Sequence, residues 1–102
     1  MGRLDVSGKI LDLSYPPGYQ GIAPAKKLIG LNIAEVFPHF HEVESCLRAV
    51  DAVIRYKRAL VHTHAVAFGS RRGLRQARIL PLSDTEVVFF QSHWNNSRDW
   101  TV

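Results

Sequence analysis

Two histidines separated by one residue are the most suggestive chemical feature of the sequence. His62 and His64 lie in a segment rich in strand-forming residues, so both side chains should point to the same face of a strand. Two imidazoles on one face could bind a metal ion, but a site needs a third or fourth ligand. The other histidines, His39, His41 and His93, lie at undefined distances from this pair. The pattern favours ordinary hydrogen-bonded histidines, and we predict no metal site.

A cysteine and a basic loop are the other candidates for chemistry. Cys46 is the only cysteine, which excludes an intramolecular disulfide and fits a reducing compartment. It occupies an apolar position of a helical pattern, where a thiol behaves as a small buried hydrophobe. Residues 69–73 (GSRRG) could bind an anion, but this composition is also typical of a solvated hairpin loop. Because the chain has no nucleophile elbow and no glycine-rich phosphate loop, we assign no catalytic residues and expect no enzymatic activity.

The composition indicates a single small globular domain. The chain has 102 residues, of which 46% are hydrophobic and 22% charged, with a formal net charge of +4. The basic residues are scattered, which is more typical of a solvated surface than of a nucleic-acid interface. No apolar run approaches the length of a membrane span, and the first residues lack the pattern of a signal peptide. We therefore expect a cytoplasmic protein that binds neither membranes nor nucleic acids.

The elements that must position these residues are one helix and five strands. The clearest is a helix over residues 41–59, because apolar residues recur there at spacings of three and four. Two short strands near residues 4–6 and 10–13 flank a turn at Ser7-Gly8, and residues 23–28 and 33–37 predict short helical turns. Three further strands are predicted at residues 60–68, 74–82 and 86–94, joined by short loops and therefore antiparallel. This order predicts an α+β fold with helices on one face of an antiparallel sheet.

The order and spacing of three segments resemble the PAS family. They are residues 6–11 (VSGKIL), residues 28–38 (LIGLNIAEVFP), and residues 78–82 (RILPL) followed after a short turn by residues 87–90 (VVFF). The first resembles the opening hairpin of the family, and the last pair its closing hairpin. The resemblance spans residues 3–93. It implies a five-stranded antiparallel sheet in the order 2-1-5-4-3, with residues 1–94 forming one sensor domain. Residues 95–102 would be a polar tail or the start of a linker.

The resemblance also implies a function in signal transduction. PAS domains act as sensors or dimerisation modules attached to an output such as a histidine kinase of a two-component system, a cyclase or a transcription regulator. The cofactor is left open. A flavin adduct is disfavoured because the residues around Cys46 differ from those of the light-sensing subclass. Haem is disfavoured because His41 lies only at the start of the long helix.

Two sets of residues follow from this interpretation. The apolar helix face should meet the closing strands across an interior that binds a small ligand, lined by Cys46, Val50, Val53, Ile54, Ala77, Ile79 and Phe89. Cys46 and Ala77 are where unfilled volume is expected, since both are small. The last strand is apolar on both faces, so its outer face needs a cover. We expect a homodimer that buries Val88, Phe90 and Trp94.

Two alternatives remain open. The domain could be a dimerisation or docking module with a packed core and no ligand. It could also be a small α+β enzyme built around a cavity. A polar group buried in an apolar cavity would favour ligand binding, and a filled core would favour the docking module.

Overall fold

The computed structural model describes residues 1–15, 17 and 23–93. Trp94 and the predicted tail at residues 95–102 lie outside the described residues. The elements follow the chain as β1 (Gly2–Asp5), β2 (Ile10–Leu13), α1 (Ala25–Leu28), a short 3₁₀ turn η1 (Ile33–Glu35), α2 (Phe40–Tyr56), β3 (Leu60–Phe68), β4 (Arg71–Pro81) and β5 (Glu86–His93). No helix in this part of the chain is long and apolar enough to cross a membrane.

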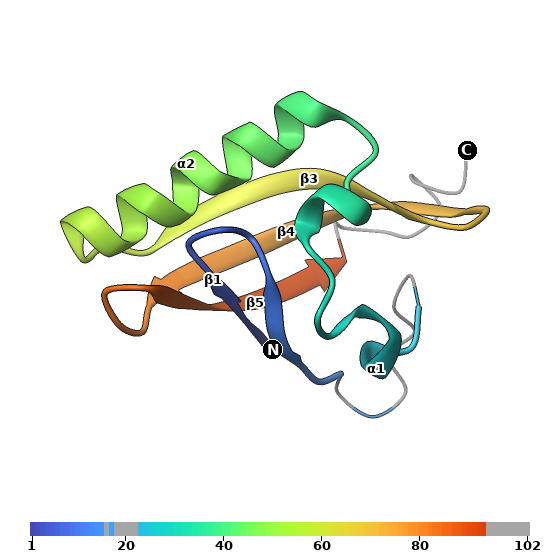
Figure 1. The fold of residues 1–102 in the computed structure, drawn as a ribbon, viewed down its shortest axis with the longest axis horizontal. Coiled ribbons are helices and arrows are strands. Elements are labelled where there is room, and N and C mark those ends of the chain that lie inside the picture. Colours follow the sequence, from blue (N-terminus) through green and yellow to red (C-terminus); the bar gives the residue numbers. More distant parts are fainter. Residues whose placement is uncertain (16, 18–22, 94–102) are drawn as a thin grey trace.

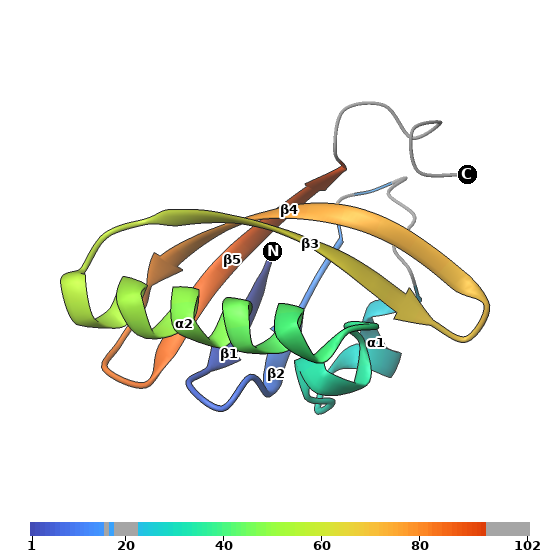
Figure 2. The same ribbon diagram turned by 90° about the horizontal axis from the view of Figure 1, so that it is seen from above.

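The strands form one antiparallel sheet in the order β2-β1-β5-β4-β3, which confirms the predicted α+β fold and the predicted strand order. Strand β1 lies between β2 and β5, so the two ends of the domain meet in the middle of the sheet (Figure 1). Helices α1 and α2 lie on the same side of the curved sheet (Figure 2). The sheet therefore has an inner face toward the helices and an outer face without a helix among the described residues.

Helix α2 forms because its apolar residues share one face. Val43, Cys46, Val50 and Val53 are buried, and Asp51 and Arg55 form an exposed ion pair of 3.2 Å on the other side. The helix ends at Tyr56 and is capped by Lys57, whose backbone is left-handed with φ 55°. The predicted helix extended to residue 59. It ends earlier because a left-handed residue reverses the chain direction, a role that glycine usually fills.

The hairpin between β3 and β4 is tighter than predicted. Only Gly69 and Ser70 form the turn, and residues 71–73 already belong to β4. Gly69 has φ +61°, a backbone conformation that glycine adopts without strain. The predicted loop over residues 69–73 is therefore wrong in length. Because a two-residue turn is compatible with the twist of the paired strands, β3 and β4 stay hydrogen-bonded as far as Phe68 and Arg71, on either side of the turn.

The turn between β1 and β2 is held by a side chain. One carboxylate oxygen of Asp5 accepts hydrogen bonds from the backbone N–H of Ser7 (2.9 Å), the Ser7 hydroxyl (2.6 Å) and the backbone N–H of Lys9 (3.0 Å). Gly8 follows with φ +90°. A Cβ atom there would lie 2.9 Å from a side-chain carbon of Ile33, so the close approach of η1 also requires glycine.

The segment before α2 closes one end of the core. Asn32 and Glu35 form a capping box around η1. Backbone hydrogen bonds join Ile10 to Leu31 (2.8 Å) and Gly30 to Ile10 (2.7 Å), so this segment runs along the edge of β2. The backbone N–H of Ala67 in β3 donates to Val36 O at 2.7 Å. These hydrogen bonds link the segment between α1 and α2 to both edge strands, β2 and β3, and cover this end of the interior.

Candidate functional site

A cavity of about 60 Å³ lies between the inner face of the sheet and the segments that cover it. Its wall is mainly apolar and comes from every layer of the fold, including Leu4 of β1, Leu28 of α1 and Cys46 of α2. A buried water needs about 10–15 Å³ of cavity volume measured with a water-sized probe, so the space suits roughly four waters or a small organic molecule with a similar number of heavy atoms. An apolar wall with few polar groups is typical of sites for small molecules.

The predicted lining residues divide into two groups. Cys46, Ala77, Ile79 and Phe89 line the cavity. Val50 and Val53 are fully buried but do not border it, and Ile54 is half-buried against the core. The second group lies further along α2, where the helix packs directly on the sheet. The cavity lies beside the first half of the helix, next to the small side chains of Cys46 and Ala77.

The polar part of the wall was missed by the sequence interpretation. His64 of β3, Arg75 of β4 and Gln91 of β5 border the cavity. The strand register explains their position, since His64 pairs with Arg75 and Ala77 pairs with Gln91. Counting by two from Ala77 and from Phe89 would have placed Arg75 and Gln91 on the inner face. Their charge and polarity made the surface the expected place for them.

Four side chains form a hydrogen-bonded chain that reaches the cavity wall at His64 and Gln91. Ser45 Oγ lies 3.1 Å from His62 Nε2, His62 Nδ1 lies 3.2 Å from His64 Nδ1, and His64 Nε2 lies 3.4 Å from Gln91 Nε2. Because two Nδ1 atoms face each other, one must carry a proton and the other must accept it. The imidazoles are therefore complementary tautomers. The chain links α2 to β5 through the pair predicted to share a face.

Burial keeps both imidazoles neutral. It lowers the pKa of His64 to about 3, and the nearby His62 and Arg75 act in the same direction. Burial also lowers the pKa of His62, although the charge of Glu42 opposes this shift. His64 stacks on Phe37 with ring centroids 4.5 Å apart. Both ring nitrogens of His64 are used within this chain, so His64 positions Gln91 and leaves Gln91 and Arg75 as the polar groups that can contact a ligand.

Among residues 1–15, 17 and 23–93, no group of three His, Cys, Asp or Glu side chains is placed to hold a metal ion. His39 and His41 stack on each other at the exposed start of α2, with ring centroids 5.5 Å apart. The side chain of His93 lies outside the described side chains. Burial raises the pKa of the Cys46 thiol to about 12, so the group is protonated and poorly nucleophilic at neutral pH.

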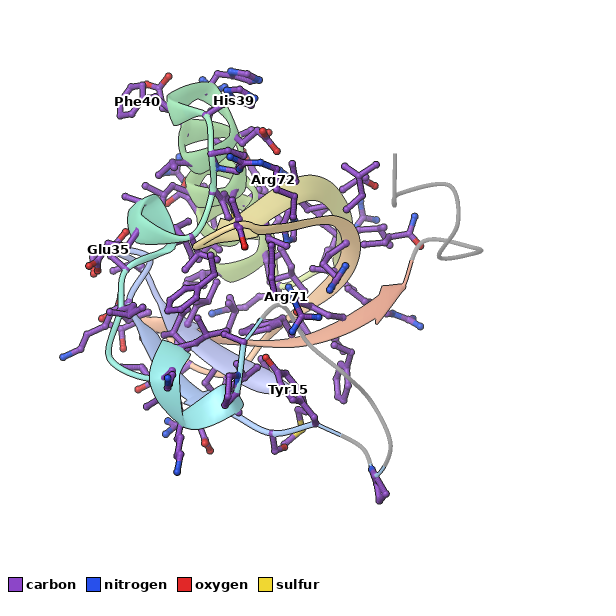
Figure 3. All side chains as sticks on the ribbon, turned by 90° about the vertical axis from the view of Figure 1, so that its right-hand side faces the viewer. Tyr15, Glu35, His39, Phe40, Arg71 and Arg72 are labelled. Carbon is purple, nitrogen blue, oxygen red and sulfur yellow. The ribbon has the colours of Figure 1, made fainter. Side chains whose placement is uncertain are left out.

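The end of the molecule near the β3–β4 hairpin is basic. Figure 3 looks onto this end and shows Arg71 and Arg72 of the hairpin together with Tyr15 and the start of α2. Arg71 and Arg72 are exposed, whereas Arg75 on the same strand is buried. A Cβ atom at Gly73 would lie 2.6 Å from Arg75 Nη1, so glycine leaves the space that the guanidinium occupies. The β3–β4 hairpin thus lies next to a buried cation in the cavity wall.

The comparisons with known proteins add no family to this description. No family model matches the chain. No curated protein and no solved structure matches it significantly.

Proposed function

We propose that this chain is a sensory domain of the PAS type that binds a small ligand in the internal cavity and signals to an output domain outside the chain. The observation that carries the proposal is a mainly apolar cavity with His64, Arg75 and Gln91 in its wall. The sheet order and the position of the helices agree with the order that the resemblance implies. A docking module with a packed core would leave neither free volume nor polar side chains inside.

The route for a signal would be β5. Phe89 and Gln91 line the cavity, and the strand pairs with both β1 and β4 in the middle of the sheet. A ligand shifts an equilibrium between two states only by its different affinity for them. A ligand that contacts these two side chains would favour one arrangement of the strand, and β5 leads toward the C-terminal end of the described residues.

Ligand binding can be tested on the purified chain with small probes. The panel contains alcohols, amides, amines and carboxylates of roughly two to four carbon atoms, chosen to match the cavity volume. Ligand-observed NMR should detect at least one class, and hydrogen exchange at the β5 amides should slow in its presence. Cys46→Leu should abolish binding by filling the cavity, whereas Arg48→Leu on the exposed side of α2 should not.

Two results would contradict the sensor proposal. If a urea titration shows that the protein is folded and no probe in the panel binds to it, the docking module is favoured. Conversion of a probe to a product, lost in Gln91→Ala, would instead favour the small enzyme.

We further propose that the outer face of the sheet pairs two copies of the chain. Phe90 is 47% exposed and Val61 is 60% exposed, and the register places both beside Arg78. Val88 is half-buried on the same face. Two-fold pairing would cover this apolar face with the same face of a second copy. Trp94, the third predicted interface residue, lies outside the described residues.

Phe90→Asp should convert the dimer to a monomer in sedimentation velocity at high micromolar concentration, because a carboxylate would be buried at the interface. Leu82→Asp is the control, since Leu82 is equally exposed but lies in the turn after β4. A monomeric wild-type chain at these concentrations, or a Phe90→Asp variant that is folded and still dimeric, would refute the pairing.

A further inference from the structure

Among the residues that the structure describes, Arg75 is a buried cation without a negative partner. Its exposed fraction is 8%, and the ion pairs among the described residues do not include it. Its described side-chain hydrogen bond runs from Nη1 to the backbone oxygen of Leu74, at 2.8 Å. A guanidinium has five N–H donors, so most of them remain available. Burying a charge without a partner is costly, and proteins normally pair such a charge with an anion.

The other side chains around Arg75 do not neutralise it. His64 is its partner across the ladder and is neutral, and Gln91 is uncharged. Glu42 of α2 acts on the charge of His62, but its carboxylate accepts a hydrogen bond from the backbone N–H of Ala65 at 2.6 Å and does not line the cavity. The described wall therefore carries one net positive charge, which a single negative charge would balance.

The rest of the cavity selects for an apolar group. Cys46, Ala77, Ile79 and Phe89 line it beyond the polar residues. The planar fork of a guanidinium matches the two oxygens of a carboxylate. An inorganic anion could pair with the guanidinium of Arg75 but would leave the apolar part of the cavity empty. Two negative charges would exceed the one positive charge that is available.

The approach to Arg75 is also suited to an anion. Arg71 and Arg72 are exposed on the hairpin at the same end of β4, and the chain has a formal net charge of +4 (Figure 3). Positive charges around an entrance raise the local concentration of anions and speed their association.

From these observations we propose that the cavity binds a small monocarboxylate of roughly two to four carbon atoms, with its carboxylate on Arg75 and its alkyl group against Ala77 and Phe89. Gln91 donates a hydrogen bond to the same carboxylate. The inference rests on the proposed sensory function and specifies the ligand class of that site. It makes Arg75 the residue that determines specificity, and the hydrogen-bonded histidines the support that positions Gln91.

The test compares propionate with propionamide, which has nearly the same shape and no charge, by NMR titration at neutral pH and constant ionic strength. Wild-type protein should bind propionate and bind propionamide much more weakly. Arg75→Met should weaken propionate binding roughly 30-fold, because hydrogen bonds between charged groups are lost. Arg48→Met is the matched control, since Arg48 is exposed on α2 away from both the cavity wall and the outer face of the sheet, and should bind as wild type does.

Each remaining outcome decides between the proposals. Equal binding of propionate and propionamide, or unchanged binding by Arg75→Met, overturns the carboxylate inference while leaving a ligand-binding sensor. Competition by nitrate as strong as that by propionate also overturns it, because the apolar part would then contribute nothing. Failure of every probe overturns the sensory function itself. The propionate–propionamide comparison uses wild-type protein, so it decides the question even if Arg75→Met does not fold.

Discussion

Replacing Ile79 by alanine should lower the free energy of unfolding by about 4 kcal/mol. Ile79 is 1% exposed and lies in β4, between β3 and β5. It borders the existing cavity, so the truncation would enlarge a space that neighbouring side chains already fail to fill. Without collapse of the surrounding structure, the variant loses both the transfer free energy of the removed carbons and their packing contacts.

Urea unfolding followed by circular dichroism measures this loss. The midpoint should fall and the dependence on urea concentration should stay the same, as expected when stability changes without a change in the denatured state. Leu74→Ala is the control, because Leu74 lies on the same strand but is 40% exposed on the outer face. Its cost should be below about 1 kcal/mol. Similar losses in the two variants would show that Ile79 is not in a packed interior.

Acidification from pH 6.5 to pH 5 should lower the free energy of unfolding by about 2 kcal/mol through His64 alone. The folded-state pKa of His64 is about 3, while an unfolded histidine has a value near 6.5. Between these values the unfolded chain binds a proton that the folded chain does not bind. Stability is therefore highest above pH 6.5 and falls as the pH drops toward 3. His62 shifts in the same direction and adds to the loss.

His64→Gln should reduce the number of protons taken up on unfolding by about one, which makes stability less dependent on pH. It should also lower stability at pH 7, because the stack on Phe37 is lost. His41→Gln should leave the pH dependence as in wild type, since His41 is exposed at the start of α2. Urea titrations at half-unit steps of pH measure both. Equal wild-type stability at pH 7 and pH 5 would mean that His64 is accessible to protons in the folded state.

Local patterns were sufficient for the elements and their faces. The three- and four-residue spacing in α2 placed Cys46, Val50 and Val53 in the interior, and alternation in β4 and β5 placed Ala77, Ile79 and Phe89 opposite them. The pattern failed at the β3–β4 hairpin, where Arg71 and Arg72 suggested a loop. Backbone pairing determines that strand end, and exposed arginines are compatible with a strand as well as with a loop.

The α+β class, the order of the elements, the inner position of the apolar residues and the shared face of His62 and His64 could all be predicted from the sequence. These properties depend on side-chain periodicity, which is local to each segment. The tertiary structure shows that Arg75 is buried without an acidic partner among the described residues, that His64 meets Gln91, and that the cavity lies beside Cys46 but not beside Val53. The first two depend on the register of β3, β4 and β5, and the third on how α2 packs on the sheet. Residues far apart in the chain set that geometry together, so no single segment encodes it.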